Sequence, residues 1–188
     1  GETAVVFGQG TVGLLVSELL VRSGARVISV EPSAIRRRAS GSIGCTTLSP
    51  LAGPVADRVL ELTGGRGADL AVNVTGSEQA LQAGIDCLGM EGRLVEASWY
   101  GTRETRLSLG GSFHRRRLKL ISSQVSTLAP SLSARWDKAR RLSLVMDLLR
   151  EARPSRYISR SFPLEDAQKA FELIDRSPGE LVQVVLTP

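Results

Sequence analysis

Three glycines and one acidic residue near the N-terminus have the spacing of a dinucleotide-binding turn. Gly8, Gly10 and Gly13 form the pattern G-x-G-x-x-G, and Glu31 follows the last glycine by 18 residues. In such a turn the first glycine permits a tight bend, the second lets backbone amides approach a pyrophosphate, and the third lets a helix pack on its strand. A carboxylate at the position of Glu31 can accept hydrogen bonds from a ribose diol.

The segments around these glycines follow the order strand, helix, strand. Residues 3–7 are β-branched and aromatic enough for a buried parallel strand. A helix expected over residues 11–23 would direct its N-terminal amides and the positive end of its dipole at phosphates. Gly24 ends that helix, and residues 27–30 form the second strand. A glycine turn alone can be purely structural, but an acid directly after the second strand favours dinucleotide binding.

The remaining sequence continues to alternate between strands and helices. Further strands are expected at residues 45–48, 68–74, 93–97 and 118–122, with helices at 34–40, 54–63 and 77–88 and a turn at Gly89 and Gly92. This order predicts an α/β Rossmann fold, a doubly wound parallel sheet with helices on both faces. A connection over residues 127–136, a helix over residues 134–151, and then strand, helix and strand predict a C-terminal α/β appendage. The boundary is expected between residues 1–150 and 151–188.

Composition narrows the classes of function. The net charge is +5, and much of the excess lies in two arginine clusters at residues 36–38 and 115–117. No nucleic-acid-binding motif accompanies them and aromatic residues make up 4% of the chain, so we expect no direct nucleic-acid function. No apolar run is long enough to span a membrane and no signal peptide is recognised. Cys45 and Cys87 are expected to be reduced, buried thiols of a cytoplasmic protein.

The choice between NAD and NADP depends on opposing charges. A carboxylate at Glu31 would repel the 2′-phosphate of NADP, whereas arginines at residues 36–38 would attract it. Because the acid occupies the decisive end of the strand, the sequence favours NAD, with NADP as the alternative.

Several longer segments resemble the medium-chain dehydrogenase/reductase superfamily, and within it the zinc-type alcohol dehydrogenase branch. The matching segments are VVFGQGTVGLL, SGARVISVEPS, LTGGRGADLAVNVTGS, GRLVEASWYG and the ending SFPLEDAQKAFELIDRSPGELVQVVLTP. They run along nearly the whole chain but correspond only to the cofactor-binding part and C-terminal tail of a typical member. The resemblance implies a homodimer joined through the strand at residues 118–122.

The resemblance also implies a role for particular residues. The pyrophosphate would be held by Gly8, Gly10, Thr11, Val12 and Gly13. The adenosine would be held by Glu31, Arg36, Thr75 and Gly76. Ala97 and Ser98 would lie near the nicotinamide.

The chain departs from this family in its metal-binding residues. Members carry a preceding catalytic domain that supplies cysteine, histidine and acidic zinc ligands, whereas this chain has one histidine and two separated cysteines. We therefore expect no catalytic zinc and no catalytic residue here, and His114 is expected on a surface loop.

The resulting hypothesis is the nicotinamide-binding part of an oxidoreductase that transfers hydride between NAD(P) and an alcohol or carbonyl, inactive without a catalytic domain supplied in cis or in trans. The alternatives are a non-catalytic NAD(H)-binding regulatory or partner module, and a fragment of a zinc-independent quinone or enoyl reductase.

Overall fold

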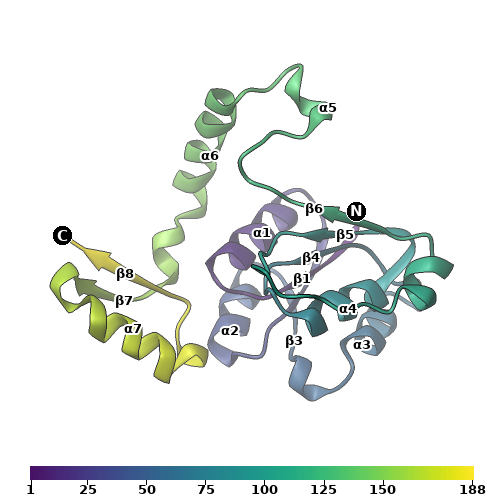
Figure 1. Cartoon of the computed structure of the whole chain (residues 1–188), viewed down its shortest axis with the longest axis horizontal. Coiled ribbons are helices and arrows are strands. Elements are labelled where there is room, and N and C mark those ends of the chain that lie inside the picture. The colour runs from purple at the N-terminus through teal and green to yellow at the C-terminus, as the bar shows by residue number, and fades with distance from the viewer.

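The computed structural model describes residues 1–188 and contains the predicted Rossmann sheet (Figure 1). Six parallel strands pair in the order β3-β2-β1-β4-β5-β6. Their bounds are β1 Thr3–Phe7, β2 Arg26–Val30, β3 Thr46–Leu48, β4 Ala68–Asn73, β5 Leu88–Glu96 and β6 Lys119–Ser122. The order reverses between β1 and β4, so the carboxyl ends of these two central strands flank the crevice where doubly wound folds bind ligands.

Helices cover both faces of this sheet, and the alternation of side chains along β1 shows why. Val5 and Phe7 belong to a core that also contains side chains of α3 and α4, whereas Ala4 and Val6 face α1. The helices are α1 Thr11–Arg22, α2 Ala34–Ser42, α3 Val55–Leu62 and α4 Glu78–Cys87. A strand with apolar side chains on both faces needs cover on both, and this confirms the doubly wound prediction.

Two local predictions were wrong. The turn expected at Gly89 and Gly92 lies inside β5, which already pairs with β4 at Leu88 and shifts register before Arg93. The helix expected from residue 134 begins instead at Lys138, because the Asp137 side chain accepts a hydrogen bond from the Arg140 amide at 2.7 Å. A short helix, α5 (Pro130–Ser133), occupies the preceding connection.

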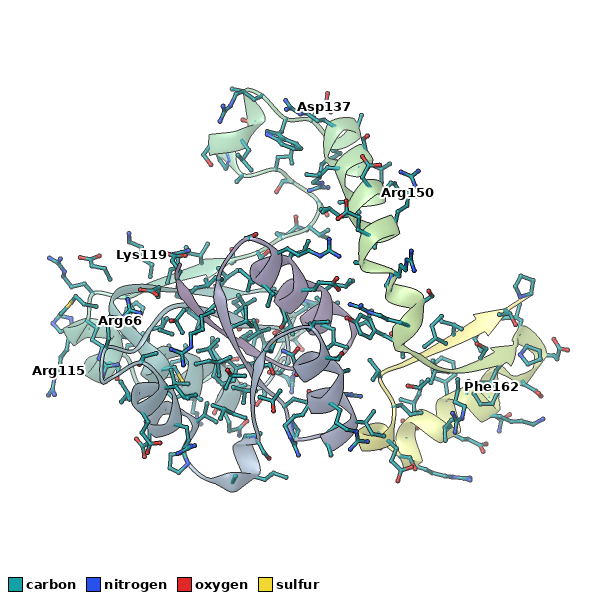
Figure 2. The ribbon with its side chains drawn as sticks, turned by 180° about the vertical axis from the view of Figure 1, so that it is seen from behind. Arg66, Arg115, Lys119, Asp137, Arg150 and Phe162 are labelled. Atoms are coloured by element: carbon teal, nitrogen blue, oxygen red, sulfur yellow. The ribbon has the colours of Figure 1, made fainter.

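The long helix α6 (Lys138–Ala152) connects the sheet to a smaller C-terminal unit. Its second half packs on α1, where Val145 and Leu149 meet Leu15 and Leu19 around a small apolar cavity. Its first half extends away from the sheet: Figure 2 shows Asp137 at the outer end and Arg150 nearer the body. No helix in the structure is both long and apolar enough to cross a bilayer.

The C-terminal unit is a second, two-stranded parallel sheet with one helix. It comprises β7 (Ile158–Pro163), α7 (Ala167–Arg176) and β8 (Gln183–Thr187), and lies beside α2 in Figure 1. Short helical turns complete the chain: η1 Pro50–Ala52, η2 Leu109–Phe113, η3 Pro154–Tyr157, η4 Leu164–Asp166 and η5 Pro178–Glu180.

A buried carboxylate joins this unit to the Rossmann domain. Glu18 on α1 is 6% exposed and accepts hydrogen bonds from Arg22 at 2.9 Å and from Arg156 at 2.7 Å. The Tyr157 hydroxyl lies 3.4 Å from the same carboxylate. Burial raises the pKa of Tyr157, so this hydroxyl stays protonated and can donate a hydrogen bond to Glu18.

Candidate cofactor-binding site

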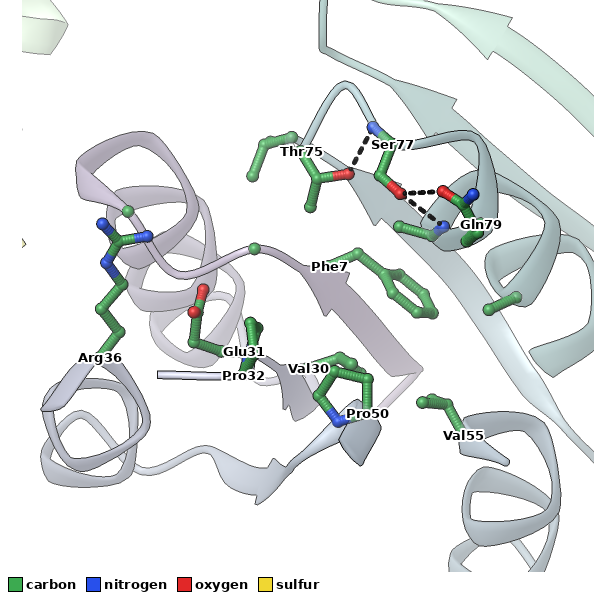
Figure 3. A pocket seen from close by; sticks show the side chains of 15 residues that line it. Phe7, Val30, Glu31, Pro32, Arg36, Pro50, Val55, Thr75, Ser77 and Gln79 are labelled. Atoms are coloured by element: carbon green, nitrogen blue, oxygen red, sulfur yellow. Dashed lines mark hydrogen bonds between the residues drawn. The ribbon is translucent and has the colours of Figure 1, made fainter. Parts of the chain in front are cut away.

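A cavity of about 550 Å³ opens at the carboxyl ends of β1, β2 and β4. Figure 3 shows Glu31 and Arg36 on one wall, Thr75, Ser77 and Gln79 on the opposite wall, and Phe7 between them. The cavity lies at the reversal of strand order, where parallel α/β sheets bind ligands.

The glycines after β1 form a close-packed turn with one open side. Gly8 has a φ of +90°, and a Cβ added to Gly13 would lie 1.9 Å from the Gly8 carbonyl oxygen. A Cβ on Gly10, which caps α1 and lines the cavity, would meet nothing within 4 Å. The turn therefore offers the cavity a helix N-terminus with unobstructed backbone, the arrangement that suits a pyrophosphate.

Glu31 is fixed at the cavity wall by backbone amides. It is 3% exposed, and its carboxylate accepts hydrogen bonds from the amides of Gln9 at 2.7 Å and Ser33 at 2.9 Å. None of the ion pairs in the structure includes this carboxylate. Each oxygen uses one acceptor position for these amides, and a carboxylate offers about four in all, so acceptor capacity remains for a ligand with two hydroxyl donors.

Two of the arginines that follow Glu31 bind backbone carbonyls. Arg36 lines the cavity, but its Nε donates to the Leu181 carbonyl at 2.7 Å and its Nη2 donates to the Pro178 carbonyl at 2.9 Å. Arg37 donates to the carbonyls of Glu31 and Pro32.

A polar network supports the opposite wall. The buried Asn73 side chain accepts from the Thr75 hydroxyl at 2.7 Å and donates to the Glu96 carboxylate at 2.8 Å and the Tyr100 hydroxyl at 2.9 Å. Burial and the neighbouring Glu96 raise the pKa of Tyr100 to about 12, so this phenol stays protonated. The network fixes the loop after β4, in which Ser77 caps α4 through the Ala80 amide.

Five of the eleven residues predicted for the site line the cavity: Gly8, Gly10, Glu31, Arg36 and Thr75. The others lie around it. Gly13 is buried under the turn and Val12 is 60% exposed. Thr11 donates to the Gln183 side chain at 2.6 Å, the Gly76 carbonyl accepts from Arg103, and Ser98 donates to Glu96 beside the exposed Ala97.

Sequence reasoning missed the apolar floor of the cavity. It is lined by Phe7, Val30, Pro32, Pro50, Val55, Val74, Ala80 and Ala83. Ala80 and Ala83 are small and three residues apart on α4, so they lie on one face of the helix. This spacing was the sequence signal that could have indicated a cavity wall.

The single histidine and the two cysteines form no metal-binding cluster. No group of three or more His, Cys, Asp or Glu side chains is close enough to hold a metal ion. His114 is exposed at the end of η2. Cys45 and Cys87 are free and buried, and burial raises the pKa of Cys45 to about 11 and that of Cys87 to about 12.

The chain is similar in sequence to known dehydrogenases. A family model described as zinc-binding dehydrogenase matches residues 11–143. The chain is 30% identical to the 2-dehydro-3-deoxy-L-galactonate 5-dehydrogenase of Pseudoalteromonas atlantica, over 98% of this chain and 51% of that protein. It is 28% identical to an L-threonine 3-dehydrogenase of Caldanaerobacter subterraneus, over 100% of this chain and 52% of that protein.

The chain is also similar in structure to a solved dehydrogenase. An alcohol dehydrogenase from Thermotoga maritima superposes with a TM-score of 0.83 at 25% identity, covering 100% of this chain and 50% of that one. The chain thus spans about half the length of the relatives it matches. With the family model covering most of its length, the chain belongs to the zinc-binding dehydrogenase family within the medium-chain dehydrogenase/reductase superfamily.

Proposed function

We propose that this chain binds a nicotinamide dinucleotide in the cavity beside Glu31 and serves as the cofactor-binding part of an alcohol dehydrogenase-like oxidoreductase. The observation that carries the proposal is Glu31 itself, a buried carboxylate without a cation partner that faces a cavity beside an open glycine turn. A ribose diol supplies the two hydroxyl donors that this carboxylate can still accept.

Each part of the dinucleotide has a place in this proposal. The pyrophosphate lies against Gly10 and the first turn of α1, with Thr11, Val12 and Gly13 completing the bend. The adenine lies on the apolar floor between η1, α3 and α4, and Thr75 and Gly76 border the adenosine. Ala97 and Ser98, at the end of β5, border the nicotinamide.

The bound nicotinamide would supply hydride transfer to or from an alcohol or carbonyl, while this chain binds and orients it. The names of the relatives support this reaction class, because each is a dehydrogenase of a hydroxylated substrate.

We further propose that residues 1–150 are the cofactor-binding domain and that residues 151–188 pack on a catalytic domain provided in cis or in trans. The C-terminal unit exposes large apolar side chains, among them Leu164 at 63% and Phe171 at 64%. Burying such side chains is favourable by about 1.5–3 kcal/mol each, so a partner surface over them would be stabilising.

Glu31 also favours NAD over NADP, because a 2′-phosphate would be placed against a buried carboxylate without a counter-charge. The test is calorimetric titration of the chain with NADH and with NADPH. We expect NADH to bind more tightly by about tenfold or more, which corresponds to about 1.4 kcal/mol. Replacing Glu31 by Gln should weaken the binding of NADH and narrow the difference in affinity between NADH and NADPH. The Gln side chain has one neutral carbonyl oxygen as acceptor, whereas Glu has two charged carboxylate oxygens.

The matched control is Glu61→Gln, a side chain 62% exposed on α3 and outside the cavity lining, which should leave both affinities unchanged. Absence of binding by either dinucleotide would refute the proposed function. Tighter binding of NADPH would preserve dinucleotide binding and refute the role given to Glu31.

A further inference from the structure

A second carboxylate, Glu96, is the last residue of β5 and is surrounded by hydrogen-bond donors. It accepts from the Ser98 amide at 2.7 Å, the Ser98 hydroxyl, the Asn73 side-chain amide at 2.8 Å and the Tyr100 hydroxyl at 3.1 Å. None of the ion pairs in the structure includes Glu96. We call Asn73, Glu96, Ser98 and Tyr100 the Glu96 cluster.

The hydrogen bonds of Glu96 use its whole acceptor capacity. A carboxylate offers about four acceptor positions, two on each oxygen. In Glu96 one oxygen accepts both groups of Ser98, and the other accepts from Asn73 and Tyr100. Glu31, by contrast, accepts from two amides. Glu96 therefore has no acceptor left for a ligand, and its half-buried charge acts on the protein itself.

The Glu96 cluster connects two loops that border opposite halves of the proposed dinucleotide. Asn73 ends β4, and its side-chain oxygen accepts from the Thr75 hydroxyl at 2.7 Å. Its backbone carbonyl accepts from the Ala97 amide at 2.9 Å. Thr75 belongs to the loop proposed to border the adenosine, whereas Ala97 and Ser98 belong to the loop proposed to border the nicotinamide.

The loop that follows β5 is held mainly through this cluster. Ala97 is exposed and Trp99 is 88% exposed, so neither side chain fixes the loop by packing. The Tyr100 ring packs on the core that includes side chains of α4. Residues 97–99 are therefore suspended between β5 and Tyr100, and among their side chains only that of Ser98 is hydrogen-bonded to the protein.

We infer that Glu96 is a positioning residue for the nicotinamide half of the proposed cofactor. By binding Ser98 and Asn73 at once, it holds residues 97–99 in a fixed place beside the ends of β4 and β5. The inference rests on the proposed dinucleotide site. It gives a role to a carboxylate that has no free acceptor for the cofactor.

The experiment compares the affinities of NADH and ADP-ribose by calorimetry. ADP-ribose has the adenosine, both phosphates and the second ribose but no nicotinamide, so the ratio of the two affinities isolates the contribution of that ring. We expect the natural chain to bind NADH about tenfold more tightly than ADP-ribose.

Glu96→Gln keeps the size of the side chain but replaces one acceptor oxygen by an NH₂ donor. That group must face either the Ser98 amide or the Asn73 amide, which are both donors. We expect NADH to bind more weakly by about fivefold or more. ADP-ribose should change by less than about twofold, because the oxygen of Asn73 still holds Thr75.

A double variant and a control sharpen the test. In Asn73→Asp combined with Glu96→Gln, the amide and the carboxylate change places, so the hydrogen bond between the two side chains can form again with donor and acceptor exchanged. NADH affinity should return to within about twofold of the natural chain. The matched control is Glu104→Gln, an exposed residue of the same connection between β5 and β6, which should leave both affinities unchanged.

Four results would overturn the inference. The natural chain could bind NADH and ADP-ribose equally, Glu96→Gln could leave their ratio unchanged, or it could weaken both ligands by the same factor. The fourth is a folded double variant that binds NADH no better than Glu96→Gln. If the natural chain binds neither ligand, the proposed function fails instead, so the two failures are distinguishable.

Tyr100→Phe covers the case in which the variants at Glu96 do not fold. It keeps the ring on the core and removes one of the four donors to Glu96. We expect NADH affinity to fall by about two- to threefold with ADP-ribose unchanged, and amide exchange of residues 97–99 to rise several-fold. Unchanged NADH affinity in this variant would show that the cluster does not position the nicotinamide.

Discussion

Gly10 and Gly13 belong to one sequence pattern but meet opposite surroundings. A Cβ at Gly10 would enter open space at the cavity, and its backbone angles of −69° and −171° suit any residue. We therefore expect Gly10→Ala to fold with unchanged stability, and to weaken NADH binding by about tenfold or more because the methyl group occupies the pyrophosphate position. Thermal unfolding and calorimetric titration of the same sample test both halves of the prediction.

Gly13→Ala should instead lower the stability of the fold. Its Cβ would lie 1.9 Å from the Gly8 carbonyl oxygen, so β1 and α1 must move apart. Overpacking of this kind costs about 1–3 kcal/mol. We expect urea unfolding to show that loss, in contrast to Gly10→Ala. Equal stability of the two variants would contradict the separate roles given to these glycines.

The two buried thiols predict how stability depends on alkaline pH. Burial raises the pKa of Cys87 to about 12 and that of Cys45 to about 11, from an ordinary value of 9.0. Above pH 9 the unfolded chain releases thiol protons that the folded chain retains, so the free energy of unfolding falls as pH rises toward 11 or 12. The stabilisation is fully present below pH 9. Each thiol contributes a slope of up to about 1.4 kcal/mol per pH unit.

Urea unfolding at pH 8, 9.5 and 10.5 checks this prediction. Cys87→Ala should show a shallower decline than the natural chain, because one of the two thiols no longer titrates on unfolding. Other groups that ionise in this range are common to both proteins and cancel in the comparison. Identical slopes would show that Cys87 does not ionise on unfolding as predicted.

At the level of residues, the sequence predicted what depends on local chemistry. The positions of Gly8, Gly10 and Glu31 at one edge follow from a strand, a turn and an acid that are close in sequence. The hydrogen bonds of Arg36 could not be predicted, because its partners are carbonyl groups. Every residue has the same backbone carbonyl, so no sequence signal marks the ones that come to lie beside Arg36.

Among the elements, α1 has a second role beyond facing a pyrophosphate. Its Glu18 binds Arg22 and Arg156 and so holds the chain where α6 ends and the C-terminal unit begins. Glu18→Ala leaves two arginines that are 36% and 45% exposed and can reach water, so we expect a loss of about 1–3 kcal/mol rather than collapse. Amide exchange should increase over η3 and β7 and much less over β1 and β4.

The matched control for this prediction is Glu172→Ala on α7. Glu172 pairs with Arg176 at 3.4 Å, and both side chains are exposed. Exposed pairs contribute about 0–1 kcal/mol, so unfolding and exchange should be nearly unchanged. If Glu18→Ala behaves like this control, Glu18 does not anchor the C-terminal unit.

The elements differed in how well their limits could be predicted. β1 was predicted with its observed bounds, because its buried apolar run ends at a glycine turn. The start of α6 was misplaced because the capping aspartate, Asp137, lies within a sequence that is otherwise compatible with a helix. β5 was shortened because Gly89 and Gly92 resemble a turn, whereas Gly89 in fact packs close against the Arg66 carbonyl.

For the whole molecule, the edge of the sheet leads to a prediction about assembly. β6 is the last strand of the sheet, and all four of its residues are exposed, including Leu120 at 43% and Ile121 at 42%. An uncovered edge strand with apolar side chains invites pairing with another strand. The symmetric solution is a homodimer in which β6 meets its own copy, because most homo-oligomers close with two-fold symmetry.

We therefore expect sedimentation equilibrium to give a mass of twice 20.1 kDa. Leu120→Glu should shift it to that of a monomer, since the substitution places two like charges near the symmetry axis. Leu51→Glu is the matched control: Leu51 is 81% exposed on η1, close to β3 at the opposite edge of the sheet, and its substitution should leave the dimer intact. If the natural chain is monomeric at high concentration, the predicted dimer does not exist. If Leu51→Glu dissociates the dimer and Leu120→Glu does not, the contact lies away from β6.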